Sequence, residues 1–198
     1  MEINHLKKIY QLIFIKYCLW RNKVSKAFRE IIWITSEIEA IFSSPNDKIF
    51  FRKLYLKLND VDYQSPIWIG RNFRIFQPHN ISFGRRCAFG DNVTISNHAP
   101  IQIGDDFLAA SGLHINSGGH NLETLQPITE KIIIGERVWC GVNVTILHGI
   151  EIGSDVVIGA NSLVCKNISS KTVVVGNPAK PIKDLQRNNC KQLWTWVR

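Results

Sequence analysis

The residue of this chain best suited to acid–base chemistry is a histidine in an unusual setting. His120 lies in the stretch "SGGHNLET", residues 117–124, which has two glycines and no aliphatic rhythm. An imidazole titrates near neutral pH, so it can take up or release a proton as a general acid or base. Glu123 either orients this imidazole or is a solvent-exposed loop charge. The stretch predicts a loop that carries a titratable side chain, with glycines that let it bend.

The sequence around this loop repeats at a six-residue interval. A period of six suits neither an amphipathic helix nor a simple hairpin sheet. It fits a chain that turns a corner every six residues and stacks each coil on the last, burying a continuous apolar column. The apolar series of the second half is Ile134, Cys140, Ile146, Ile152, Ile158 and Val164. In the first half the unit recurs every twenty residues, as Ile69, Ile75, Phe83, then Phe89, Ile95, Ile103, then Ala109, Ile115.

The repeat breaks after Ile115 and resumes near Ile134, so the loop with His120 is an insertion between coils. Asparagine and aspartate side chains tolerate the unusual backbone angles of sharp bends. We therefore expect the corners of the coils at Asn72, Asp91, Asn92, Asp105, Asn143, Asp155 and Asn161.

Residues 3–43 have a different period. Apolar residues step by three or four without a proline before Pro45, which predicts an amphipathic helix or helical hairpin. Within residues 1–29 there are seven cations and one anion. The apolar face either packs on the main domain, which we favour, or lies on an anionic membrane surface. The apolar stripe is Leu6, Ile9, Ile13, Tyr17, Trp20, Val24, Phe28, Ile31, Ile34, Ile38 and Ile41.

Composition narrows the classes of protein. The 198 residues carry a net charge of +8, but the chain has no nucleic-acid recognition motif, and we expect no nucleic-acid partner. Five cysteines without a C-x-x-C argue against a disulfide framework or a zinc ribbon and favour a reducing compartment. The N-terminal apolar run is shorter than the ~20 residues of a membrane-spanning helix. We expect a cytoplasmic protein, with peripheral contact at the inner membrane face through residues 1–43 as an alternative.

The stretch "IGERVWCGVNVTILHGIEIGSDVVIGANSLVCKNI", followed by "VVVGNPAKPI", resembles the hexapeptide-repeat acyltransferases. The resemblance covers about residues 67–184 and is closest to the galactoside, maltose, serine and polysaccharide O-acetyltransferases. It implies a mainly β fold, a left-handed parallel β-helix, and a homotrimer with active sites between subunits. It also implies acetyl-CoA as the donor.

The resemblance assigns roles to individual residues. His120 matches the catalytic base, and the backbone N–H of Val142 matches the donor to the tetrahedral oxyanion. With no Cys or Ser nucleophile needed, we expect direct transfer. Trp139 either packs on the pantetheine arm or is a trimer-interface aromatic. Gly141 and Ala160 match the floor of the pantetheine groove. Basic positions near the CoA phosphates match Lys166, Lys180 and Lys183, each of which is otherwise a solvated surface charge.

The acceptor side matches less of the family pattern. The family often has an Asn or Asp on an earlier coil that faces the histidine, and Asn97 and His98 lie at roughly that position. Asn92 is a further candidate, although its position at a corner favours a role in the turn. Residues 1–60 do not align with the segment that carries acidic acceptor ligands in the simple sugar O-acetyltransferases. We therefore expect a sugar hydroxyl in a surface polysaccharide or its lipid-linked precursor, with N-acetylation of an amino sugar as an alternative.

The expected organisation has three parts. An amphipathic helical segment spans 1–60, a β-helix with a loop at 116–131 spans 67–177, and a capping helix spans 178–198, using Ile182, Leu185, Leu193 and Trp196. A zinc hydrase of the γ-carbonic anhydrase type is an alternative, with ligands among His98, His114, His120 and His148. His114 and His120 are six residues apart, whereas that family's paired ligands are five apart. We expect no metal, and a catalytically silent scaffold would need no loop histidine.

Overall fold

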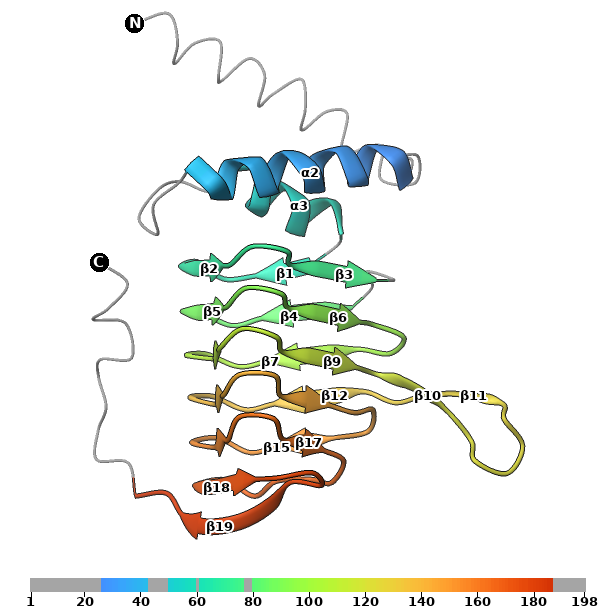
Figure 1. Cartoon of the computed structure of the whole chain (residues 1–198), viewed down its shortest axis with the longest axis vertical. Coiled ribbons are helices and arrows are strands. Elements are labelled where there is room, and N and C mark those ends of the chain that lie inside the picture. Colours follow the sequence, from blue (N-terminus) through green and yellow to red (C-terminus); the bar gives the residue numbers. More distant parts are fainter. Residues whose placement is uncertain (1–25, 43–49, 60, 77–79, 187–198) are drawn as a thin grey trace, which may run out of the picture.

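The computed structural model of the chain describes residues 26–42, 50–59, 61–76 and 80–186. The chain winds into a stack of flat coils, with two helices across one end and a long hairpin leaving the side (Figure 1). Most strand pairs are parallel, because each coil runs in the same sense as the one before it. The expected β-helix of stacked coils is confirmed.

Each complete coil contributes one short strand to each of three walls. The first three coils are β1 (Val61–Tyr63), β2 (Ile67–Ile69), β3 (Arg74–Phe76); β4 (Ile81–Phe83), β5 (Cys87–Phe89), β6 (Thr94–Ser96); and β7 (Ile101–Ile103), β8 (Leu108–Ala109), β9 (His114–Asn116). The hairpin β10 (Gly118–His120) and β11 (Pro127–Thr129) follows. The later strands are β12 (Ile132–Ile134), β13 (Trp139–Cys140), β14 (Thr145–Ile146), β15 (Glu151–Ile152), β16 (Val157–Ile158), β17 (Leu163–Val164), β18 (Thr172–Val175) and β19 (Lys180–Asp184).

The three walls are named here by their strands. Wall A is β1-β4-β7-β12-β15, wall B is β2-β5-β8-β13-β16-β18-β19, and wall C is β3-β6-β9-β14-β17. In the first coils Ile67 pairs with Cys87 and Arg74 with Thr94, twenty positions on, as the longer repeat predicts. The equivalent corners of successive coils therefore lie above one another.

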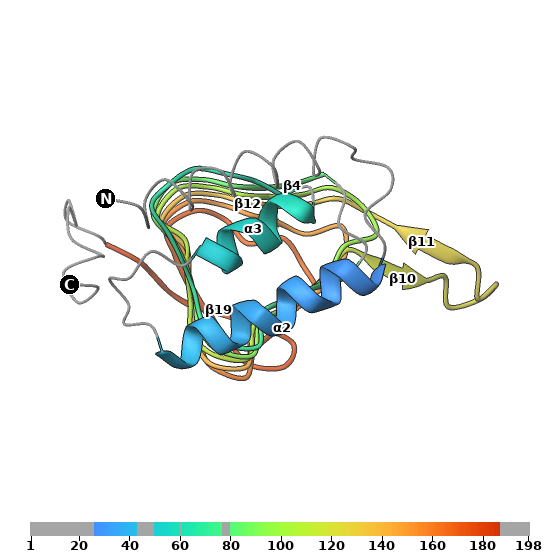
Figure 2. The ribbon, with the colours of Figure 1, turned by 90° about the horizontal axis from the view of Figure 1, so that it is seen from above.

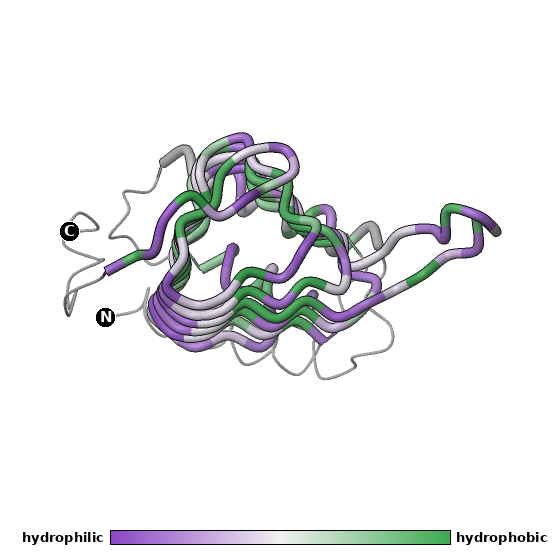
Figure 3. The backbone as a smooth tube through the Cα atoms, turned by 90° about the horizontal axis from the view of Figure 1, so that it is seen from below, coloured by the Kyte–Doolittle hydropathy of each residue, from purple (hydrophilic) through white to green (hydrophobic). Residues whose placement is uncertain are grey.

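The core is the apolar column inside these walls. Phe89 is fully buried, and its ring centroid lies 5.4 Å from Phe73, 4.9 Å from Phe83 and 5.4 Å from Phe107. In the second half the six-residue series supplies smaller side chains, of which Cys140, Ile146 and Ile158 are fully buried. The hydropathy pattern repeats from coil to coil in the stacked tube (Figure 3).

The corners use left-handed backbone, as expected from their polar residues. Asn72, Asn92, Asn143, Asp155 and Asn161 have φ between 53° and 59°. Asp91 and Asp105 also lie at corners, as expected, but without positive φ. Their carboxylates instead bind the arginine one coil earlier, with Arg71 Nη2 2.8 Å from Asp91 Oδ2 and Arg85 Nη2 2.8 Å from Asp105 Oδ2. These ion pairs tie successive corners together.

Two helices close the first coil. Helices α2 (Lys26–Phe42) and α3 (Phe50–Leu58) cross the open end of the prism (Figure 2). Leu56 is fully buried, and the Tyr55 hydroxyl accepts the backbone N–H of Ile75 at 3.1 Å. The helices therefore cover apolar side chains that a further coil would otherwise cover. Within the described residues, no helix is long and apolar enough to cross a membrane.

The face of α2 that packs differs from the one expected. Ile31, Ile34 and Ile38 of the predicted stripe are 56%, 51% and 51% exposed, whereas Ile32 and Ser36 are buried. Trp33 anchors the packed face of the helix to the first coil. Its Nε1–H donates to the carbonyl of Phe73 at 3.1 Å, and the guanidinium of Arg74 lies 3.7 Å from its ring centroid. The part of the stripe before residue 26 lies outside the described residues.

The expected helix at 178–198 is wrong where the structure describes it. Residues Lys180–Asp184 form β19, which pairs antiparallel with β18, and Ile182 is 58% exposed. The free edge of β18 needs partners for its backbone groups, and Pro181 disfavours a helix interior. Leu193 and Trp196 lie outside the described residues.

Candidate active site

The hairpin leaves the prism at the corner between wall C and wall A. Strand β9 ends at Asn116, and the next residue, Ser117, is fully buried. The Ser117 hydroxyl accepts the backbone N–H groups of His98 and Ala99, each at 2.8 Å, and donates to the carbonyl of Ala99 at 3.0 Å. This serine, which no motif in the sequence singles out, anchors the hairpin to the coil before it.

The predicted loop at 116–131 is an ordered two-stranded hairpin. Gly118 pairs with Thr129, Gly119 with Ile128 and His120 with Pro127. At its base the N–H of Glu130 donates to the carbonyl of Ser117 at 3.0 Å. Figure 1 shows the hairpin projecting well beyond the walls. A side chain on it is therefore placed outside the prism of its own chain.

His120 is exposed at the end of β10. No hydrogen bond joins its imidazole to Glu123 or to any other residue in the described part of the chain. Glu123 lies at the tip, where its N–H donates to Asn121 Oδ1 at 3.0 Å, together with the N–H of Thr124 at 2.9 Å. The structure thus gives Glu123 a place in an asparagine-capped turn, and its orienting role stays a prediction.

The two glycines before His120 are in contact with two histidine rings. A Cβ on Gly118 would lie 2.6 Å from Cδ2 of His98, and a Cβ on Gly119 would lie 2.7 Å from Nε2 of His148. Neither glycine has a positive φ. The expectation that they let the loop bend is therefore wrong: glycine is required because the rings approach the backbone closely.

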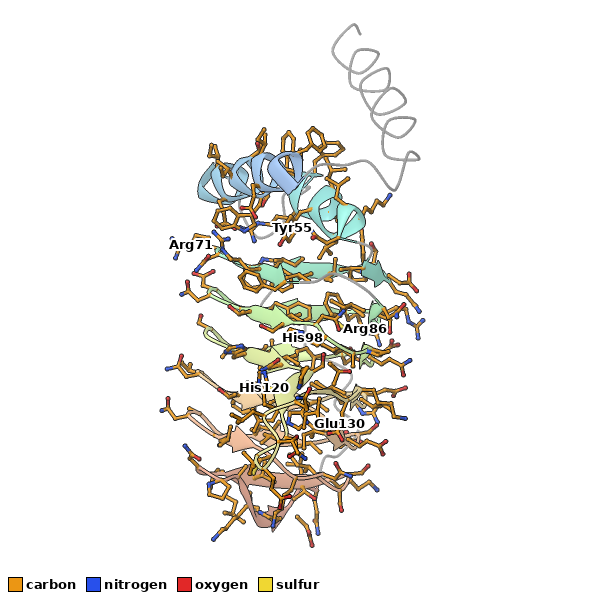
Figure 4. All side chains as sticks on the ribbon, turned by 90° about the vertical axis from the view of Figure 1, so that its right-hand side faces the viewer. Tyr55, Arg71, Arg86, His98, His120 and Glu130 are labelled. Atoms are coloured by element: carbon orange, nitrogen blue, oxygen red, sulfur yellow. The ribbon has the colours of Figure 1, made fainter. Side chains whose placement is uncertain are left out.

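The two rings come from the coils on either side of the hairpin. His98 follows β6 and His148 follows β14, so each stands at the same corner, one coil before and one coil after. Successive residues of a strand face opposite ways, so His120 shares the face of Gly118, which is turned toward His98. Figure 4 views the hairpin end-on, with His98, His120 and Glu130 following one another along the long axis.

The other candidates for the acceptor side are split between two places. Asn97 adjoins His98, is buried, and donates its N–H to the carbonyl of Phe76 at 3.0 Å. Asn92 lies at the corner between walls B and C, where its Oδ1 accepts from Nδ2 of Asn72 at 2.9 Å. Asn92 therefore takes part in a corner ladder and is not brought to His120 within one chain.

The candidates for the donor side gather around the B–C corner. Trp139 and Val142 are 44% and 45% exposed. The carbonyl of Val142 accepts from Asn161 N–H at 2.8 Å, and its own N–H has no backbone partner among the described residues. A Cβ on Gly141 would lie 2.7 Å from the backbone nitrogen of Ala160, so only glycine fits there.

The three lysines proposed for the CoA phosphates lie toward the last coils of the prism. Lys180 and Lys183 are exposed on β19, and Lys183 pairs with Val173. Trp139, Val157 and Val173 are in register across wall B, which places Lys183 in the same column as Trp139. The spacing between strands makes that separation about 14 Å. Lys166 lies instead at the C–A corner, below His148.

One chain thus separates the two halves of the expected site. The hairpin with His120 leaves the C–A corner, and Val142 lies at the B–C corner. Among the described residues, no three His, Cys, Asp or Glu side chains converge as metal ligands. His114 is exposed on β9, away from the hairpin faces that contact His98 and His148.

Comparisons with known proteins agree with this architecture. Residues 131–166 match the family model described as bacterial transferase hexapeptide (six repeats). A protein of Escherichia coli K12 named as an O-acetyl transferase of lipopolysaccharide biosynthesis, WbbJ, is 37% identical over 136 residues, which are 57% of this chain and 67% of that protein. This match and three further curated relatives are each covered to between 54% and 67% of their own length.

Solved structures show the same fold. A maltose O-acetyltransferase from Clostridium difficile superposes with a TM-score of 0.68 at 29% identity, covering 80% of this chain and 87% of that one. A hexapeptide-repeat acetyltransferase of Vibrio cholerae, solved with acetyl coenzyme A, gives a TM-score of 0.66 at 24% identity and covers 84% and 93%. With the stacked coils, the inserted hairpin and these matches together, the chain belongs to the hexapeptide-repeat acetyltransferase family.

Proposed function

We propose that the protein transfers an acetyl group from acetyl-CoA to a sugar hydroxyl, with His120 as general base. The observation that carries the proposal is the hairpin: it holds an exposed imidazole, hydrogen-bonded to none of the described residues, outside the wall of its own chain. A base that must accept a substrate proton needs such an unoccupied nitrogen.

The reaction balances without an acyl-enzyme. The sugar oxygen attacks the thioester carbonyl carbon while its proton passes to His120. The C–S bond then breaks, and the proton passes from the imidazolium to the departing sulfur, which leaves as CoA thiol. The Val142 N–H donates to the oxyanion of the tetrahedral intermediate. Its lack of a backbone partner in the described chain supports this role.

The donor binds along wall B in this proposal. The pantetheine arm lies against Trp139 and over the flat floor formed by Gly141 and Ala160, where the backbones pack too closely for a side chain on Gly141. Lys180 and Lys183, about three strands further along the wall, hold the phosphates, and Lys166 adds charge near the last corner. The acetyl coenzyme A bound to the Vibrio cholerae relative supports this donor.

The complete site forms between subunits of a homotrimer. In a cyclic assembly each interface joins two different surfaces of neighbouring subunits. The hairpin of one subunit can then meet the B–C corner of the next, which unites His120 with Val142. Leu122 and Leu125 at the hairpin tip are 96% and 73% exposed, and a neighbouring subunit would cover them.

The acceptor occupies the hairpin face that carries His120. His98 borders that face at Gly118, which supports its contact with the sugar, whereas Asn97 beside it is buried. The name of the Escherichia coli relative supports a polysaccharide or its lipid-linked precursor as the acceptor. An amino sugar acetylated on nitrogen is the second outcome that an acceptor screen distinguishes.

We also propose that the protein acts on the cytoplasmic side of the membrane, where acetyl-CoA is made, with peripheral contact through residues 1–43. The exposed row Ile31, Ile34 and Ile38 supports this, because a row on the outer face of α2 matches an interfacial helix. The test is flotation with vesicles that contain phosphatidylglycerol. Replacing all three isoleucines by serine should release the protein, whereas the control Phe76→Ser should not. Equal flotation of both variants contradicts the contact.

The enzymatic test is an acceptor screen with mass detection of the acetylated product and of free CoA. His120→Ala should lower kcat by about 10²–10⁴-fold. His114→Ala is the matched control, since it removes another exposed histidine from the adjoining strand. Full activity of a folded, trimeric His120→Ala protein would sink the mechanism.

A further inference from the structure

We propose that His148 and Glu130 form a brace that fixes the direction in which the hairpin leaves the prism, and so positions His120. The brace rests on the proposed function only in taking His120 as the base. Neither residue touches the reacting atoms, so both are positioning residues.

The brace connects the two arms of the hairpin through one ring. His148 Nδ1 lies 2.8 Å from Glu130 Oε2, at the end of the returning arm. The opposite nitrogen, Nε2, lies against Gly119 on the outgoing arm, 2.7 Å from where a Cβ would stand. The imidazole therefore spans the base of the hairpin, with one nitrogen at each arm.

Local residues make room for this arrangement. Gly149, directly after His148, has a φ of 73°, and a Cβ there would collide with the Glu130 carboxylate. Gly119 is likewise open toward the ring. Two glycines thus leave space for the same histidine–carboxylate pair, and the corner has to keep both for the pair to form.

The corner that holds His148 is closely packed and hydrogen-bonded. Ile146 and Ile150 on either side are 0% and 5% exposed, and the N–H of Leu147 donates to the carbonyl of Val164 at 3.0 Å. The His148 side chain itself is only 26% exposed. The pair therefore transfers the rigidity of the coil to the hairpin.

The hairpin needs such support, because an isolated two-stranded hairpin is at best marginally stable in water. From the other side the ring of His98 packs on Gly118. The first two residues of β10 are thus held between rings from two coils, and His120 is the next residue along the strand. A small rotation at this base moves the imidazole of His120 away from the acceptor.

Four variants separate the parts of the brace. His148→Asn keeps a donor at the position of Nδ1 but removes the ring from Gly119. His148→Phe keeps a ring but has no donor for Glu130. His148→Ala removes both contacts, and Glu130→Gln removes the charge of the partner. Glu151→Gln is the matched control, since Glu151 is an exposed carboxylate on the next coil whose ion pair within the described residues is with Lys131, at 3.8 Å.

The first readout is hydrogen exchange, which does not depend on catalysis. His148→Ala should speed the exchange of the amides at 118–130 by about tenfold or more relative to wild type, while the amides of the walls keep their rates. His148→Asn should lie between wild type and His148→Ala. The second readout is the split between kcat and KM: kcat should fall by up to about 10²-fold, the effect of a displacement near 1 Å, with KM for acetyl-CoA unchanged.

The outcomes distinguish the brace from the proposed function. Wild-type exchange and wild-type kcat in His148→Ala overturn the brace, whatever His120→Ala does. A rise in KM for acetyl-CoA with unchanged kcat also overturns it, because that result places His148 in donor binding. If His120→Ala is fully active but His148→Ala speeds exchange in the hairpin alone, the proposed function fails and the brace remains.

Discussion

The ring of His98 lies directly against the α-carbon of Gly118, so that a Cβ there would stand 2.6 Å from Cδ2 and 2.7 Å from Cγ. This contact joins the hairpin to the coil before it. It also explains a glycine in an extended strand, where glycine is otherwise unfavourable.

Gly118→Ala should lower the melting temperature, because the new methyl group displaces the His98 ring. In a His98→Ala background the same substitution should lower the melting temperature by less, because the ring that the methyl group displaces is absent. A double-mutant cycle followed by thermal unfolding should give a coupling of about 0.5–3 kcal/mol between the two positions. Equal losses in both backgrounds would show that the ring does not govern this position.

If each active site combines residues of two neighbouring subunits, two inactive variants should complement each other in mixed trimers. Ala160 is exposed at the B–C corner, so Ala160→Trp should block the donor groove without disturbing the coil. Mixed trimers of His120→Ala and Ala160→Trp chains, made by co-expression, should recover about a quarter of the wild-type activity if chains mix at random and each site uses two neighbours. Two inactive parents that stay inactive when mixed would place both residues in one subunit's site.

The aromatic column predicts a large cost for one core substitution. Phe89 is fully buried among Phe73, Phe83 and Phe107. Phe89→Ala should lower the free energy of unfolding by about 3–5 kcal/mol, as expected for a buried aromatic side chain. Phe76→Ala, at a position 50% exposed, should change it by less than about 0.5 kcal/mol. Urea denaturation measures both, and similar values for the two would contradict the packing.

Low pH should destabilise the fold at the corners where aspartate carboxylates bind arginine. The backbone N–H of Arg85 donates to the Asp105 carboxylate and holds its pKa below the ordinary value of 3.8. Partial burial raises this pKa, and the hydrogen bond from the Arg85 side chain lowers it further. A lowered folded-state pKa gives stability that is present above the unfolded value and lost as the pH falls through the folded value. The thermal unfolding midpoint should therefore fall as the pH is lowered below about 4, and Asp105→Asn should make this fall smaller. An unchanged pH profile in the variant would remove Asp105 as a cause.

The thiols should differ in reactivity. Burial raises the pKa of the Cys87 and Cys140 thiols to about 12, whereas Cys165 is exposed. Because the thiolate is the reactive form, iodoacetamide at pH 8 should label Cys165 in the folded protein and reach Cys87 and Cys140 only after unfolding. Peptide mass spectrometry measures the order. Early labelling of Cys140 would mean that the column opens at that coil.

Much of the fold was predictable because the repeat is local. The apolar positions recur every six or twenty residues, and each is buried against the coil stacked on its own. Asn72, Asn92 and Asn143 mark corners because asparagine tolerates left-handed backbone. The break between Ile115 and Ile134 located the hairpin, and the motif resemblance supplied His120. These features depend on residues close in sequence or on a strict period.

The remaining features depend on contacts between distant segments. Apolar spacing alone did not reveal that α2 buries Ile32 and exposes Ile34, because polar contacts of α2 with the first coil, such as Trp33 with the Phe73 carbonyl, also orient the helix. Helical propensity did not reveal that Lys180–Asp184 pair with the last strand, whose free edge attracts them.

The sequence by itself determined that coils stack and that a histidine stands in the gap between them. Only the tertiary structure decided that His98 and His148 close on the two glycines before it, and that His120 and Val142 lie at different corners. The physical reason is that a corner's neighbours are the corners of the coils before and after it, which are 16 to 20 residues away where no insertion intervenes.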